Sequence, residues 1–132
     1  IGKGITLKEG KDVTIIATGL EVNESLEAAK LLEADGISAE VINIHTIKPL
    51  DKDAVNACID EIGKIITVED HNIINGLFGA VCEVVAEAGK GIVKRIGIQD
   101  QFGQSAPYER LLAINGVTAE NIVKNAKELL AK

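Results

Sequence analysis

Hydrophobic and polar positions along the chain follow two alternating patterns. Short runs rich in Ile, Val and Thr are typical of buried strands, whereas apolar residues at steps of three and four are typical of amphipathic helices. The first pattern predicts strands at residues 5–8, 13–18, 39–45, 65–68 and 92–98. The second predicts helices at residues 23–35, 51–59, 77–88, 107–114 and 118–130.

Residues with known preferences for helix ends support these boundaries. Asn23, Asp51 and Thr118 are suitable N-caps, because their side-chain oxygens can accept a hydrogen bond from a backbone N–H of the first turn. Gly36 and Gly89 follow the apolar stripes of two helices and can adopt the left-handed conformation of a C-cap.

The alternation of strands and helices predicts a single α/β domain. Such an order favours a mostly parallel sheet with helices on both faces. Residues 9–12, between the first two strands, are too few for a parallel crossover. We therefore expect the first strand to run antiparallel to the others.

Composition limits the classes of partner. The chain has 132 residues, of which 46% are hydrophobic, as expected for one globular domain. Twenty acidic and 14 basic residues give a net charge of −6, which repels the phosphate backbone of nucleic acids. Aromatic residues make up only 2%, so few side chains could stack on bases. No apolar run reaches the roughly 18 residues of a membrane helix. We expect neither nucleic acid nor membrane as a partner.

Two cysteines bear on the compartment. Cys58 and Cys82 lie in predicted helices among apolar neighbours, and their spacing fits no metal motif. We expect buried, reduced thiols and a cytoplasmic location. The chain begins with Ile rather than Met, which suggests a fragment or a processed chain.

The most informative polar cluster follows the fourth predicted strand, where Glu69, Asp70, His71 and Asn72 separate a buried strand from a helix. Sites in α/β proteins are commonly built at such strand ends. A carboxylate beside His71 would suit acid–base chemistry. The alternative is that the acidic residues favour the N-terminus of the next helix, while His71 makes a local or interface contact. With no nucleophile or metal partner in the neighbouring sequence, we favour contact over catalysis.

A second polar loop follows the fifth predicted strand. It contains Gln99, Gln101 and Phe102, and the parallel order would place it beside the first cluster. Phe102 could anchor another surface or plug the loop locally. We take both polar loops together as a candidate domain interface.

Three nucleotide- or phosphate-related functions fit poorly. A phosphate loop needs several glycines, whereas Gly19 stands alone and Glu21 would repel phosphate. Gly76 and Gly79 supply only part of a dinucleotide fingerprint. A phospho-acceptor receiver domain would need clustered aspartates at its strand ends, which this sequence lacks.

Four motifs in order resemble a known family. The segments Asp12-Val-Thr-Ile-Ile-Ala-Thr-Gly19, Ile47-Lys-Pro-Leu-Asp51, Thr67-Val-Glu-Asp-His-Asn72 and Asp100-Gln-Phe-Gly-Gln-Ser105 are similar to those of the transketolase C-terminal domain. The same domain occurs in related thiamine-diphosphate enzymes. The resemblance runs over essentially the whole chain, so we expect residues 1–132 to form one such domain.

The resemblance implies a three-layer α/β/α fold with a five-stranded mixed sheet and an antiparallel first strand. It also implies a larger, dimeric enzyme that transfers two-carbon ketol units between sugar phosphates, as in the pentose phosphate pathway. In that family thiamine diphosphate and Mg²⁺ lie between two other domains. No catalytic, cofactor or metal residue is therefore expected in this chain, whose implied role is assembly and domain packing.

Two alternatives stay open. The parent enzyme could instead be deoxyxylulose-phosphate synthase or the β subunit of a 2-oxoacid dehydrogenase E1. From a different class, the chain could be a stand-alone regulatory module that binds a small anion at its strand ends.

Overall fold

A computed structural model of the chain describes residues 4–19, 21–44, 50–69, 76–97 and 118–131. Its strands are β1 (Ile5–Lys8), β2 (Val13–Ala17), β3 (Ala39–Asn43), β4 (Lys64–Glu69) and β5 (Ile92–Gly97). Its helices are α1 (Glu21–Ala34), α2 (Lys52–Glu61), α3 (Leu77–Ala88) and α5 (Ala119–Leu130). The helix expected at residues 107–114 lies outside the described residues.

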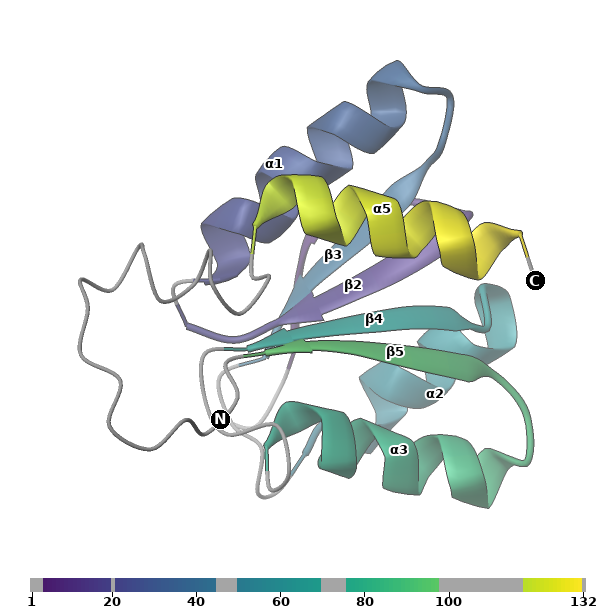
Figure 1. The fold of residues 1–132 in the computed structure, drawn as a ribbon. Helices are drawn as coiled ribbons and strands as arrows, with labels where there is room; N and C mark the ends of the chain where they lie inside the picture. The colour runs from purple at the N-terminus through teal and green to yellow at the C-terminus, as the bar shows by residue number, and fades with distance from the viewer. Residues whose placement is uncertain (1–3, 20, 45–49, 70–75, 98–117, 132) are drawn as a thin grey trace.

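The five strands form one mixed sheet in the order β1-β3-β2-β4-β5 (Figure 1). Strands β2 to β5 are parallel, and β1 pairs with β3 in the antiparallel direction. The α/β class and the antiparallel first strand are thus confirmed. The short connection between β1 and β2 passes over the start of β3, where a Cβ on Gly10 would meet the backbone of Ala39 and Glu40. Glycine at position 10 therefore permits this close crossing.

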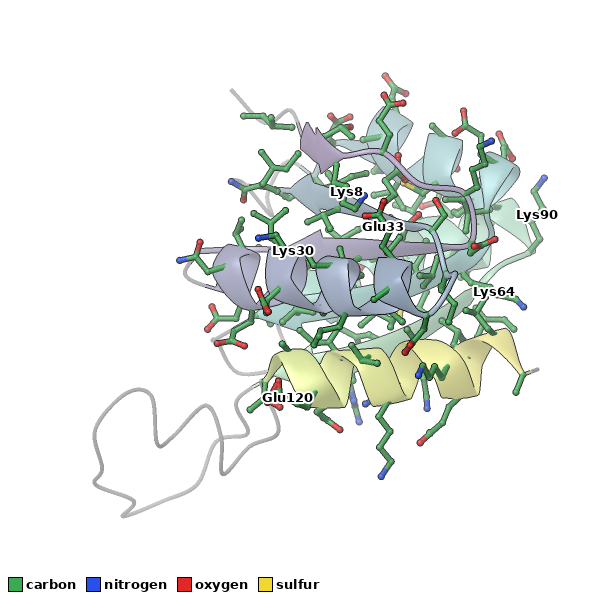
Figure 2. The ribbon with its side chains drawn as sticks, turned by 90° about the horizontal axis from the view of Figure 1, so that it is seen from above. Lys8, Lys30, Glu33, Lys64, Lys90 and Glu120 are labelled. Carbon is green, nitrogen blue, oxygen red and sulfur yellow. The ribbon has the colours of Figure 1, made fainter. Side chains whose placement is uncertain are left out.

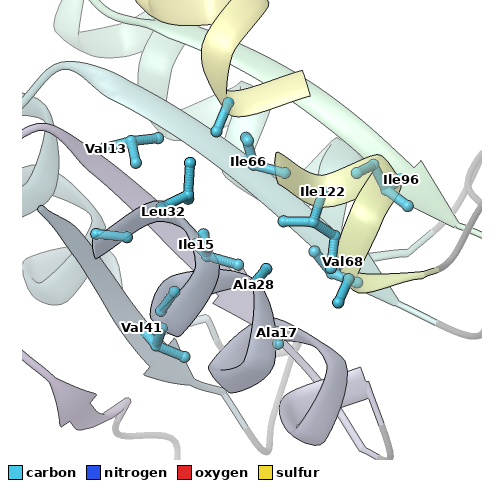
Figure 3. Packing of buried hydrophobic residues seen from close by; sticks show 14 of the residues in the cluster. Val13, Ile15, Ala17, Ala28, Leu32, Val41, Ile66, Val68, Ile96 and Ile122 are labelled. Carbon is cyan, nitrogen blue, oxygen red and sulfur yellow. The ribbon is translucent and has the colours of Figure 1, made fainter. Parts of the chain in front are cut away.

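Helices cover both faces of the sheet, as Figure 1 shows. Helices α1 and α5 lie on one face over a core of aliphatic side chains, among them Val13, Ile15, Leu32, Ile66 and Ile122 (Figure 3). Helices α2 and α3 lie on the other face, over a second core that includes Ile16, Ile42, Ile65, Leu77 and Val81. Burial of these side chains is the main favourable term for folding, at roughly 25 cal/mol per Å² of apolar surface.

Most of the helix ends predicted from local signals are confirmed. Asp51 caps α2 by accepting a hydrogen bond from Ala54 N, and Thr118 caps α5 by accepting one from Asn121 N. Gly36 and Gly89 have φ of +80° and +73° and follow α1 and α3. These signals act within four residues, which is why the sequence alone shows them.

The N-cap predicted at Asn23 is wrong. Helix α1 begins at Glu21, and Asn23 is an exposed residue inside it. The backbone N–H of Glu21 donates to the carbonyl of Thr18 at 3.3 Å, so the tight turn after β2 leads directly into the helix. A good capping side chain is thus overridden by the geometry of the preceding turn.

Candidate functional site

The carboxyl ends of β2, β3, β4 and β5 lie side by side along one edge of the sheet, here called the carboxyl edge. In a parallel α/β fold the helices begin at this edge, so their N-terminal N–H groups and positive dipole ends gather there (Figure 1). The chemistry of the carboxyl edge therefore depends on which groups meet those helix ends.

Glu69, the last residue of β4, is committed to the start of α3. Its Oε1 accepts a hydrogen bond from Leu77 N at 2.8 Å, and its Oε2 accepts one from Phe78 N at 3.0 Å. The side chain is 1% exposed. Each oxygen of this buried carboxylate accepts one N–H, and the carboxylate faces the positive end of the α3 dipole. Such a contact is strong and structural. This placement is the one that the helix-N-terminus interpretation of Glu69 predicts.

Gly76 makes this contact possible. A Cβ at residue 76 would overlap the carboxylate of Glu69. The residue has φ of −103°, so the need for glycine is one of space rather than of backbone conformation. Glu69 and Gly76 thus form a latch, the Glu69–Gly76 latch, that joins the end of β4 to the start of α3.

Two other acidic residues play similar parts at the carboxyl edge. Glu24 in α1 accepts a hydrogen bond from Ala119 N, at the start of α5, at 2.8 Å. Asp51 caps α2 and also accepts a hydrogen bond from Gly4 N at 2.8 Å. Asn43 is the last residue of β3 and so lies at the carboxyl edge. Ile5, the first residue of the antiparallel strand β1, pairs with Asn43, which places Gly4 at the same edge. Of these contacts, only the cap at Asp51 has a local signal in the sequence; Glu24 and Gly4 meet partners that are far away along the chain.

The residues predicted as a domain interface are only partly covered by the structure. Glu69 is described, and its carboxylate is occupied as above. Asp70, His71, Asn72, Gln99, Gln101 and Phe102 lie outside the described residues. By chain position they follow β4 and β5, so the interface prediction stays a prediction for these six.

The described part of the carboxyl edge is poorly suited to bind a small anion. An anion site at a helix N-terminus needs free N–H groups and an uncompensated dipole. Here α2, α3 and α5 already carry the carboxylates of Asp51, Glu69 and Glu24, and α1 begins with the buried Glu21. These negative charges would repel a further anion.

The two thiols do not take part in this chemistry. Burial, together with the nearby charge of Glu40, raises the pKa of Cys58 to about 12, so the thiol stays protonated and weakly nucleophilic. Cys58 donates to Glu40 Oε1 at 3.5 Å. Cys82 is also free but only partly buried, and that burial raises its pKa. The expectation of a buried thiol is confirmed for Cys58 and is wrong for Cys82, which lies on the half-exposed side of α3.

Thr67 presents an unusual hydroxyl just before Glu69. The side chain is fully buried, and its Oγ1 has no hydrogen-bond partner within the described ranges. Burying an unpaired hydroxyl costs free energy, so we expect Thr67→Val to stabilise the domain by about 1 kcal/mol. Urea unfolding followed by circular dichroism measures this.

Thr14→Val is the matched control for that measurement. Thr14 is equally buried in the same sheet, but its hydroxyl donates to Glu40 Oε1 at 3.0 Å. Its replacement should destabilise the domain by about 1 kcal/mol, because the hydrogen bond to Glu40 is lost. A loss of stability in Thr67→Val as large as in Thr14→Val would contradict the assignment of an unpaired hydroxyl.

The fold and the order of the motifs define a class of protein. Residues 2–122 match the family model described as "Transketolase, C-terminal domain", and the chain belongs to that family. It is 47% identical to the "Putative transketolase C-terminal section" of Methanocaldococcus jannaschii, over 100% of this chain and 41% of that protein. It is 42% identical to the "1-deoxy-D-xylulose-5-phosphate synthase" of Heliobacterium modesticaldum, over 98% of this chain and 20% of that protein.

A solved structure supports the same assignment. The structure described as "Split gene transketolase, inactive beta4 tetramer" superposes with a TM-score of 0.92 at 42% identity, over 98% of this chain and 43% of that one. The expected transketolase C-terminal fold is thus confirmed. The chain spans less than half the length of each of these relatives.

Proposed function

We propose that this chain is the C-terminal domain of a transketolase-like enzyme and that it serves assembly rather than chemistry. The observation that carries the proposal is the state of the carboxyl edge, where Glu24, Asp51 and Glu69 all bind backbone N–H groups. Acidic side chains that could act as acid, base or ligand are thereby used to hold helices and the entering chain in place.

The parent enzyme of this proposal depends on thiamine diphosphate and Mg²⁺ and transfers ketol units between sugar phosphates. Thiamine diphosphate would supply the chemistry that breaks and makes the carbon–carbon bond. The described residues do not fit this group: they contain no set of three His, Cys, Asp or Glu side chains that could hold a metal ion, and Glu69 is already bonded on both oxygens. No catalytic step is therefore assigned to residues of this chain.

The proposed docking surface is the carboxyl edge. A preceding part of the enzyme would enter at Gly4, which Asp51 fixes at this same edge. His71, with Asp70, Asn72, Gln99, Gln101 and Phe102, would contact that part of the enzyme. The related split transketolase is described as an "inactive beta4 tetramer", where beta4 refers to the assembly and not to strand β4. We extend self-association to this chain as part of the proposal.

A chimera tests the proposed function. This chain would replace the matched section of the Methanocaldococcus relative, and the product would be mixed with the complementary N-terminal section of that enzyme. We expect ketol transfer by the mixture, whereas isothermal titration of the chain alone with thiamine diphosphate and Mg²⁺ should show no binding. Micromolar binding by the chain alone, or an assembled but inactive chimera, would reject the proposal.

The role of His71 can be separated within the same chimera. We expect His71→Ala to weaken assembly about tenfold, the effect of losing roughly 1.4 kcal/mol of contact, with unchanged turnover per assembled enzyme. Sedimentation measures the assembly and a coupled assay measures the turnover. Glu83→Ala, on the exposed side of α3, is the control. Intact assembly with lost turnover would assign His71 to the chemistry instead.

A further inference from the structure

The first turn of α3 is tied to the ends of two strands, β4 and β5. Glu69, at the end of β4, accepts hydrogen bonds from Leu77 N and Phe78 N. The ring centre of Phe78 in turn lies 5.0 Å from the guanidinium carbon of Arg95 in β5. Arg95 precedes Gly97, the last residue of β5, and Gly97 pairs with Glu69 in the sheet. One helical turn therefore contacts the last part of both strands.

Both strand ends lead into the polar loops that the proposed function assigns to docking. The loops lie outside the described residues, but the residues that hold their ends are described. The 2.8 Å hydrogen bond between Glu69 Oε1 and Leu77 N joins the two sides of the segment 70–75. A loop whose ends are held together samples fewer conformations, so a contact made through it loses less conformational entropy on binding. The hydrogen bonds of Glu69 can therefore act on docking without touching the partner.

The contact between Phe78 and Arg95 lies at the surface of the domain. Arg95 is exposed and Phe78 is half-buried, and neither belongs to the two buried cores. A guanidinium is planar and stacks on an aromatic ring better than the compact ammonium of lysine does. The pair thus holds the last turn of β5 against the start of α3 without being part of the packing that stabilises the sheet.

We propose that Glu69, Phe78 and Arg95 are positioning residues for docking, which hold the ends of both polar loops in one arrangement against the start of α3. This rests on the proposed function, in which His71 and its neighbours contact the preceding part of the enzyme. It adds how the domain keeps that surface ready to bind. Glu69 acts on the loop after β4, and Arg95 acts through Phe78 on the end of β5, where the second loop begins.

Assembly of the chimera with the N-terminal section, measured by sedimentation, tests this role. Glu69→Gln keeps the size of the side chain but turns one acceptor into a donor that faces a backbone N–H. It should weaken assembly about tenfold, as much as the loss of the His71 contact itself. Arg95→Met keeps an unbranched side chain but removes the planar cation, and it should weaken assembly about threefold.

Two control variants separate positioning from stability and from charge. Val84→Ala removes core contacts from the same helix, α3, and leaves the Glu69–Gly76 latch intact, so it should lower stability in urea with unchanged assembly. Lys30→Met removes one positive charge, as Arg95→Met does, but from an exposed position on α1, which covers the opposite face of the sheet (Figure 2). It should change neither stability nor assembly.

A double-mutant cycle with His71 gives the readout that a merely structural role would not move. If Glu69 acts by positioning the His71 loop, Glu69→Gln should weaken assembly by less than about twofold once His71 is alanine, because the contact it positions is already lost. Equal weakening with and without His71 would overturn the proposal, as would unchanged assembly in Glu69→Gln or in Arg95→Met, or a loss in Val84→Ala as large as in Glu69→Gln. An unsubstituted chimera that fails to assemble would instead reject the proposed function, and this role with it.

Discussion

Replacing Glu69 by alanine should destabilise the domain by about 3–5 kcal/mol, a large effect for one polar residue. The carboxylate is buried, and it satisfies two N–H groups at the start of α3. Its removal leaves the N–H groups of Leu77 and Phe78 without a partner and opens a cavity beside Leu77. Urea unfolding monitored by circular dichroism gives the difference in free energy.

Two further variants identify the source of the effect. Glu69→Gln keeps the size of the side chain but places an amide N–H₂ where one acceptor was, so it should cost less than alanine, about 1–3 kcal/mol. Glu87→Ala, on the exposed part of α3, removes a carboxylate from the helix that Glu69 contacts and should change stability by less than about 0.5 kcal/mol. Equal losses for Glu69→Ala and Glu87→Ala would refute the capping role.

Gly76→Ala should cost nearly as much as the loss of the carboxylate itself, again about 3 kcal/mol. The added Cβ would occupy the position of the Glu69 carboxylate, which must then leave both N–H groups of α3. The backbone at residue 76 has an ordinary negative φ, so alanine brings no conformational strain of its own. The penalty is steric and depends on a single neighbour.

That dependence makes the second prediction testable by a double-mutant cycle. Once Glu69 is alanine, Gly76→Ala should cost less than about 1 kcal/mol, so the two changes are strongly non-additive. Gly10→Ala is the contrast, because its Cβ would meet backbone atoms of Ala39 and Glu40, and Glu69→Ala cannot relieve that overlap. Additive losses for Glu69 and Gly76 would show that the latch is not the reason for glycine.

The parts of the fold that depend on local pattern were predictable from the sequence. The strands and helices follow from the period of their apolar residues, and Asp51 and Thr118 were recognisable as caps because each acts three residues away. Asn23 shows the limit of such signals, since the turn at Thr18 and Gly19 starts α1 before the cap can act.

The candidate site depended on contacts that local pattern does not contain. Glu24 meets Ala119 across 95 residues of chain, and Gly4 meets Asp51 across 47. In the sequence, Gly76 was notable only as part of an incomplete dinucleotide fingerprint, whereas in the fold it leaves room for the carboxylate of Glu69. The sequence placed Glu69 at the right edge and beside the right helix, but the partners and the need for glycine follow only from the folded chain.

The position of Gly4 affects how strongly this domain has to bind its neighbours. Asp51 holds Gly4 at the same edge as the proposed docking surface. For a domain joined to a preceding one at this point, docking is an intramolecular event with an effective concentration near millimolar. A contact with a dissociation constant of only about 0.1 mM would then be some 90% formed, whereas the same contact between separate chains at micromolar concentration would be largely dissociated. The tether at Gly4 would thus let a modest interface, one that could open and close readily, act as a permanent one.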